Sequence, residues 1–151
     1  MEKSEELART HREAQLVAWA FMFTVAAHAA IVEVFMLKGD AFTGFDPQMV
    51  AAHKDYFILG GVLAFVIIRA VRTSILRGDS TDTLETLLGR LKTANMVVYV
   101  IAEVPALLGL VLFLFTGDRK DYYILAVFSI LAMILYYPKL NHWEVWIRKQ
   151  G

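Results

Sequence analysis

Cysteine is absent from the 151 residues, so the chain offers no disulfide, no thiolate nucleophile and no iron–sulfur ligand. Lysine and arginine balance aspartate and glutamate to a formal net charge of zero, which gives no basis for binding a nucleic acid. The sequence also lacks the His-Glu-x-x-His, Gly-x-Ser-x-Gly and phosphate-binding glycine-loop motifs of enzymes. These absences favour a non-catalytic protein with no metal site and no cofactor.

Apolar residues are abundant instead, at 58% of the chain, against roughly 45–50% in a soluble domain. About 20 apolar residues cross a bilayer, and the sequence predicts four transmembrane helices near residues 15–37, 56–77, 94–116 and 121–138. The first run is long and carries His28 and Glu33, so we expect it to be retained rather than cleaved as a signal peptide. The predicted fold is all-α, a four-transmembrane-helix bundle with an amphipathic C-terminal tail that forms one integral membrane domain over residues 1–151.

Capping signals predict where the helices begin and end. Ser4 is expected to cap the first helix, and Pro47 to open the second. Asp82 and Glu85 have the spacing of a capping box at the start of an extension of the third helix. Gly117 should end that helix, and the short turn after it makes the last two helices antiparallel neighbours. The extension should pack on the end of the first or second helix through Leu84, Leu87, Leu88 and Leu91.

Basic residues predict the orientation. Eleven of the fifteen lysines and arginines fall at the termini or in the connection between the second and third predicted helices and its flanks. The other four lie on the opposite side. By the positive-inside rule, this bias predicts that both termini are cytoplasmic, as in a bacterial inner-membrane protein. Aromatic residues near the C-terminus are typical of a membrane interface, and the predicted anchors are Tyr136, Tyr137, Trp143 and Trp146.

Glu103 lies in an apolar run, residues 94–116, whose only other ionisable side chain is Tyr99. A charged carboxylate at the bilayer centre costs roughly 2.5–3.5 kcal/mol on the lowest scale, so Glu103 needs a partner, a proton or an ion. At 1.5 Å per residue, Arg69 and Glu103 both lie about 12–14 Å from the inner end of their helices. We therefore predict an ion pair between them. In the alternative, Arg69 and Arg72 both reach the inner headgroups, and Glu103 is protonated or binds an ion.

Three other residues are candidates for the same polar site. Pro105 removes one amide donor and frees the carbonyl of Ile101, which kinks the helix or helps Glu103 to hold a cation or proton. His28 is expected to hydrogen-bond to another helix, because no second histidine lies at a matching depth for haem ligation. Glu33 lies close enough to the outer interface to reach water or Lys38.

The sequence around Glu103 reads Ala102-Glu103-x-x-Ala106-x-x-Gly109-Leu110-Val111-Leu112. It resembles the ion-binding helix of the proteolipid (c) subunit of rotary ATP synthases, in which a membrane glutamate precedes a similar alanine and Gly-Leu-Val run. The resemblance implies that Glu103 matches the family's proton- or sodium-binding carboxylate. It covers about one helix, and the chain departs from the family in lacking a regular glycine repeat. As a whole, the chain resembles small four-helix bacterial inner-membrane proteins.

These observations lead to three functional hypotheses. The first is an accessory or scaffold subunit that packs on other membrane helices, in contact with membrane lipids. The second is a homo-oligomeric proton or cation conductor that uses Glu103. The third is a small lipid- or quinone-modifying enzyme of the membrane.

Overall fold

The computed structural model describes residues 2–37, 42–48, 53–77 and 82–150. Within these ranges the structure contains no strand, and its five helices are α1 (Glu2–Leu37), α3 (Lys54–Ile75), α4 (Leu84–Thr116), α5 (Arg119–Leu135) and α6 (Leu140–Gln150). Three of them, α1, α3 and α4, are long and apolar enough to cross a membrane. The α5–α6 pair, bent by 55°, makes a fourth candidate if it is one span. The all-α prediction is confirmed, and three or four spans fit an integral membrane protein.

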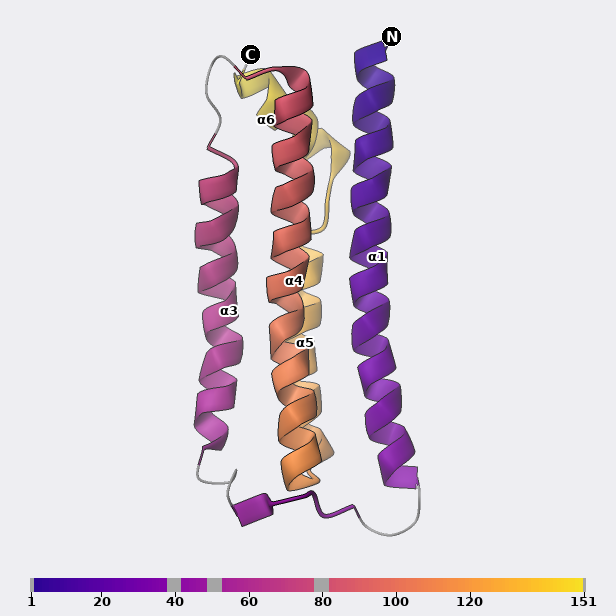
Figure 1. The fold of residues 1–151 in the computed structure, drawn as a ribbon, viewed down its shortest axis with the longest axis vertical. Coiled ribbons are helices and arrows are strands. Elements are labelled where there is room, and N and C mark those ends of the chain that lie inside the picture. The colour runs from indigo at the N-terminus through magenta and orange to yellow at the C-terminus, as the bar shows by residue number, and fades with distance from the viewer. Residues whose placement is uncertain (1, 38–41, 49–52, 78–81, 151) are drawn as a thin grey trace.

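Helix α4 is the central element of the bundle and packs against α1, α3 and α5 (Figure 1). The start of α1, the end of α3, the start of α4 and α6 lie together at one end of the bundle, called here the α6 end. The turn between α4 and α5 and residues 42–48 lie at the opposite end, called the loop end. Since successive helices reverse direction, α1 and α4 run parallel to each other.

Small residues let the neighbours of α4 approach closely, as is usual between membrane helices. A Cβ atom added to Gly109 would lie only 3.0 Å from the carbonyl oxygen of Tyr122 on α5. Hydroxyl groups also link the helices, because Tyr122 donates to the carbonyl of Val25 on α1 at 2.9 Å. The Gly109 contact places that face of α4 against α5, and the Tyr122 hydrogen bond joins α5 to α1.

The loop end follows its predicted capping signals. Gly117 ends α4 in the left-handed conformation, with φ of 75°, and its amide donates to the carbonyl of Phe113. Asp118 then caps α5 and accepts from the amide of Lys120 at 2.9 Å. Helices α4 and α5 are therefore antiparallel neighbours, as predicted. Gly44 has φ of 81°, and any Cβ there would collide with the carbonyl of Phe115.

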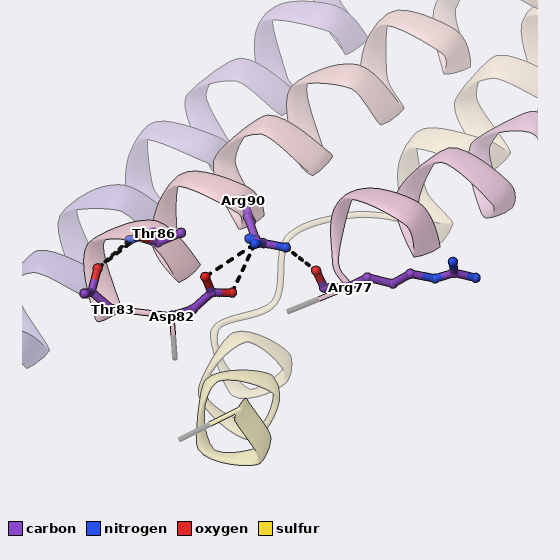
Figure 2. Close-up of polar contacts among 5 residues, drawn as sticks. All are labelled: Arg77, Asp82, Thr83, Thr86 and Arg90. Carbon is purple, nitrogen blue, oxygen red and sulfur yellow. Dashed lines mark hydrogen bonds and ion pairs between the residues drawn. The ribbon is translucent and has the colours of Figure 1, made fainter. Parts of the chain in front are cut away.

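The start of α4 differs from the prediction by one residue. Thr83, in extended conformation, is the N-cap, and its hydroxyl accepts from the amide of Thr86 at 3.4 Å. Asp82 lies one position too early to cap, and its carboxylate pairs with Arg90 at 3.1 Å (Figure 2). Arg90 also donates to the carbonyl of Arg77, which ties the end of α3 to α4.

Two other helices begin at residues that differ from the predicted ones. Helix α1 already begins at Glu2, so Ser4 lies inside the first turn and is not its cap. Pro47 and Gln48 have helical backbone, residues 49–52 lie outside the described residues, and α3 begins at Lys54 with His53 as its N-cap.

The first turns of α4 pack as the leucine stripe predicts. Leu87, Leu88 and Leu91 are buried, and Leu91 forms a cluster with Ala14 of α1 and Trp143 of α6. Trp143 is only 3% exposed, so its ring lies inside the protein and not at a membrane interface as predicted. The physical reason is that α1 and α4 together offer an apolar surface at the α6 end, on which the short helix folds back.

Candidate functional site

Glu103 lies half-buried at the middle of α4, beside a row of exposed apolar side chains. Met96, Val100 and Leu107 are 56%, 49% and 43% exposed. With Glu103 and the exposed Val111, they are spaced by three or four residues, which places them along one side of the helix. We call this set (Met96, Val100, Glu103, Leu107 and Val111) the α4 stripe. It puts a carboxylate on the least covered side of the central helix.

The predicted ion pair between Arg69 and Glu103 is wrong. No hydrogen bond or ion pair reaches either the Glu103 carboxylate or the Arg69 guanidinium anywhere in the described parts of the chain. Helix α4 meets α3 through Pro105, whose side chain lies 3.5 Å from where a Cβ of Gly61 would be. Glu103 is two residues before Pro105, which is about 200° around a helix. The two charges match in depth, but the carboxylate points away from α3.

His28 comes close to Glu103 in depth because α1 and α4 are parallel. Phe21 stacks on Tyr99 and Phe35 contacts Phe113, with ring centroids 6.0 and 6.3 Å apart. His28 lies seven residues from each phenylalanine, so it shares their face of α1. The matching midpoint on α4 is Ala106, three residues from Glu103. The imidazole therefore lies on the seam between α1 and α4, about one helical turn from the carboxylate along the bundle axis.

The imidazole of His28 has one unsatisfied atom. Its Nδ1 is buried and has no hydrogen-bond partner in the described structure. The prediction that His28 bonds to another helix is therefore wrong for this atom. Buried polar atoms without partners are uncommon in folded proteins. Among the described residues, His28 Nδ1 and the Glu103 carboxylate therefore both lack a partner, and they lie about one helical turn apart along the bundle axis.

Pro105 is accommodated by the neighbouring helix. It is buried within α4, which continues as one helix from Leu84 to Thr116. The amide of the next residue, Ala106, donates to the hydroxyl of Ser129 on α5 at 2.8 Å. Ser129 is fully buried, so this bond lies in the bundle interior. A proline loosens the surrounding turn, and here a side chain from α5 satisfies a backbone amide beside it.

The remaining acidic candidate, Glu33, belongs to the loop end. Its Oε1 accepts from the hydroxyl of Tyr123 at 2.6 Å, and its Oε2 lies 3.9 Å from Arg119. Lys38, the partner considered from sequence, lies outside the described residues. A second pair at this end was not predicted: Lys54 of α3 binds Asp121 of α5, whose side chain is 3% exposed. The sequence feature that could have predicted this pair is the position of both residues in the first turns of adjacent helices.

The two arginines of α3 lie near the α6 end. Arg69 is exposed and Arg72 is half-buried, with its guanidinium 5.7 Å from the centre of the Tyr136 ring. Tyr137 packs edge-on against Trp19 of α1, and Trp146 is partly buried beside Trp143. Of the four predicted anchors, Tyr136, Tyr137 and Trp146 remain partly exposed, and Trp143 is buried.

Comparison with protein-family models, with curated proteins and with solved structures finds no match for this chain. The described residues contain no group of three or more histidine, aspartate or glutamate side chains that could hold a metal ion.

Proposed function

We propose that this chain is a non-catalytic accessory or scaffold subunit that docks on a transmembrane helix of another membrane protein through the α4 stripe. One observation carries the proposal: the half-buried Glu103 has no hydrogen bond or ion pair in the described chain and borders an uncovered apolar row. A charged carboxylate there costs roughly 2.5–3.5 kcal/mol or more. A partner that neutralises or hydrogen-bonds it lowers that cost.

The spacing of the stripe suits a helix as the occupant. Its members follow one another at three or four residues, the repeat with which two helices interlock side chains at a crossing angle near 20°. The negative charge of Glu103 determines which kind of side chain the partner helix needs. The docking helix should carry an arginine, lysine or other hydrogen-bond donor at the depth of Glu103.

A second copy of this chain fits the stripe less well. A two-fold contact between identical stripes repeats the same residues on both sides of its axis. Two Glu103 carboxylates would then lie near each other in a medium of low dielectric constant, which disfavours charging both. A different membrane protein with a basic side chain avoids this repulsion.

Site-specific crosslinking in native membranes tests the proposal. A photoreactive side chain at Val100 should capture one discrete membrane protein, whereas the same probe at Val127, 55% exposed on α5, should not. The captured protein should have a basic residue in a transmembrane segment. Glu103→Arg should abolish capture, and a compensating basic-to-glutamate change in the partner should restore it. Equal capture from both positions, or no effect of Glu103→Arg, would contradict the proposal.

A second candidate, a homo-oligomeric proton or cation conductor, is favoured by the unpartnered Nδ1 of His28 near Glu103. Two groups that both bind protons, about one helical turn apart along the bundle axis, are the elements of a proton relay. The resemblance of the Glu103 segment to the ATP synthase proteolipid supports the same role. Purified protein in liposomes should then pass protons or sodium, and both Glu103→Gln and His28→Phe should stop the flux. Absence of flux from the wild-type protein would rule out this candidate.

We also propose a bacterial inner-membrane location, with both termini in the cytoplasm. The support is the excess of lysine and arginine at the termini and the α3–α4 connection.

A further inference from the structure

A cavity at the α6 end lies between α3 and the break that separates α5 from α6. Its volume is about 410 Å³, and its polar lining includes Arg69, Arg72, Thr73 and His142. A second hollow of about 770 Å³ shares Arg69 and Thr73 with it and extends to Arg77. The break forms the space, because α5 ends at Leu135 and the chain bends by 55° into α6, whereas α3 continues to Ile75.

Three arginines of α3 and its C-terminal end line the cavity and the adjoining hollow. Arg69, Arg72 and Arg77 form no ion pair with a carboxylate within the part of the chain that the structure describes. Asp82, at the start of the next helix, is already engaged by Arg90, and the Arg77 side chain points away from that pair (Figure 2). These three guanidinium groups lie within about two turns of one another along the chain, and together they are suited to bind an anion.

The position of the Arg72 guanidinium is restricted by a contact with Tyr136. Its guanidinium lies over the ring of Tyr136, 5.7 Å from the ring centre, which is a cation–π contact. This contact holds the group at the mouth of the cavity while its donors stay available. A guanidinium presents a planar fork of donors that matches two phosphate oxygens, which a lysine does not.

The wall of the hollow that lies farther from the α6 end is apolar and exposed at the protein surface. Phe65 and Val66 line it, and Val66 is 63% exposed. Leu135, 68% exposed, lines the cavity from α5. An arginine cluster above an apolar groove matches a phospholipid, with a phosphate at the top and an acyl chain below. A free phosphate ion would use only the upper part.

We propose that the cavity and the adjoining hollow together form a binding site for an anionic phospholipid. Its phosphate is held by Arg69, Arg72 and Arg77, and its acyl chain lies along Phe65 and Val66. Basic pockets between transmembrane helices at the inner membrane surface are a recurrent form of lipid headgroup recognition. Arg69 lies two turns deeper than Arg77, about 12 Å, so its long side chain would reach the headgroup by extending along the helix towards the α6 end. The site is on α3, which Glu103 faces away from, so it is separate from the docking proposed for the α4 stripe.

Native mass spectrometry of the purified full-length protein tests the site. The protein in mild detergent is titrated with phosphatidylglycerol or with phosphatidylcholine of the same acyl chains. We expect the anionic lipid to be retained at least tenfold more strongly. The variant carrying both Arg69→Gln and Arg72→Gln should lose that preference, because each basic side chain near an anionic surface contributes about fivefold in affinity.

The matched control carries both Arg12→Gln and Arg148→Gln, which remove the same two positive charges at the same end of the bundle from exposed side chains. It should retain phosphatidylglycerol like the wild-type protein. Circular dichroism should show unchanged helicity in all variants, because Arg69 is exposed and Arg72 half-buried. An equal loss of phosphatidylglycerol retention in this charge-matched double control would overturn the proposal, since binding would then follow net charge.

Competition with inorganic phosphate distinguishes a phospholipid ligand from a free phosphate ion. At millimolar concentration it should not displace bound phosphatidylglycerol, because it cannot use the groove along Phe65 and Val66. Full displacement, or equal retention of the neutral and anionic lipids, would contradict a phospholipid site. Val66→Asp, which places a charge in the groove, should weaken phosphatidylglycerol binding and leave any phosphate binding unchanged.

Discussion

The pair between Lys54 and Asp121 should respond very differently to the loss of each partner. The side chain of Asp121 is 3% exposed, whereas that of Lys54 is 38% exposed. Lys54→Met therefore leaves a buried carboxylate without a counter-charge. Breaking a buried pair in this way costs about 3–5 kcal/mol in soluble proteins. Because part of the Lys54 side chain is in contact with the surroundings, we expect a value near the lower limit, about 3 kcal/mol.

The reverse change should cost less. Asp121→Ala removes the buried charge, and the exposed end of Lys54 can be solvated at the loop end. What remains is the loss of one acidic group from the first turn of α5, which contributes about 0.3–1 kcal/mol, and a small cavity. We expect a total of about 1 kcal/mol. The double variant should then be close to Asp121→Ala and more stable than Lys54→Met.

The purified protein is unfolded by increasing denaturant in detergent micelles and followed by circular dichroism. This measures the change in free energy of unfolding that each single variant and the double variant causes. The double-mutant cycle gives the pair's interaction free energy. The replacement Lys120→Met, at an exposed position without a carboxylate partner in the described residues, is the control for loss of a charge at the loop end. Equal destabilisation by Lys54→Met and Asp121→Ala would refute the reasoning from burial.

Three further outcomes are expected. Ser129→Ala should lower the free energy of unfolding by about 1 kcal/mol, because the Ala106 amide loses its acceptor, while Thr24→Ala, whose hydroxyl bonds only within α1, should have little effect in the same denaturation. Gly44→Ala should destabilise the loop end, because alanine there combines a positive φ with a collision at Phe115; a lower melting temperature would show it. Since the chain has no cysteine, Thr43→Cys should be labelled only from outside intact cells and Ser4→Cys only after permeabilisation; the opposite pattern would reverse the proposed orientation.

Features that depend on position along the chain could be predicted from the order of residues alone. Apolar runs marked the long helices, and Gly117 with Asp118 marked the turn between α4 and α5. The leucine spacing identified the buried face at the start of α4. These features follow from local conformational preference and from the fixed rise of a helix, so no neighbour has to be known.

Which residues face each other depends on how the helices pack, and this could not be predicted from the sequence. Arg69 and Glu103 have similar depths, but the contact of Pro105 with α3 turns the carboxylate away, because two residues rotate a helix by about 200°. The closeness of His28 and Glu103 depends on the parallel register of α1 and α4, set by aromatic pairs far apart in the chain. The burial of Trp143 likewise requires α6 to fold back onto α1 and α4. Depth is a property of one helix, whereas direction around its axis is set by the packing of all of them.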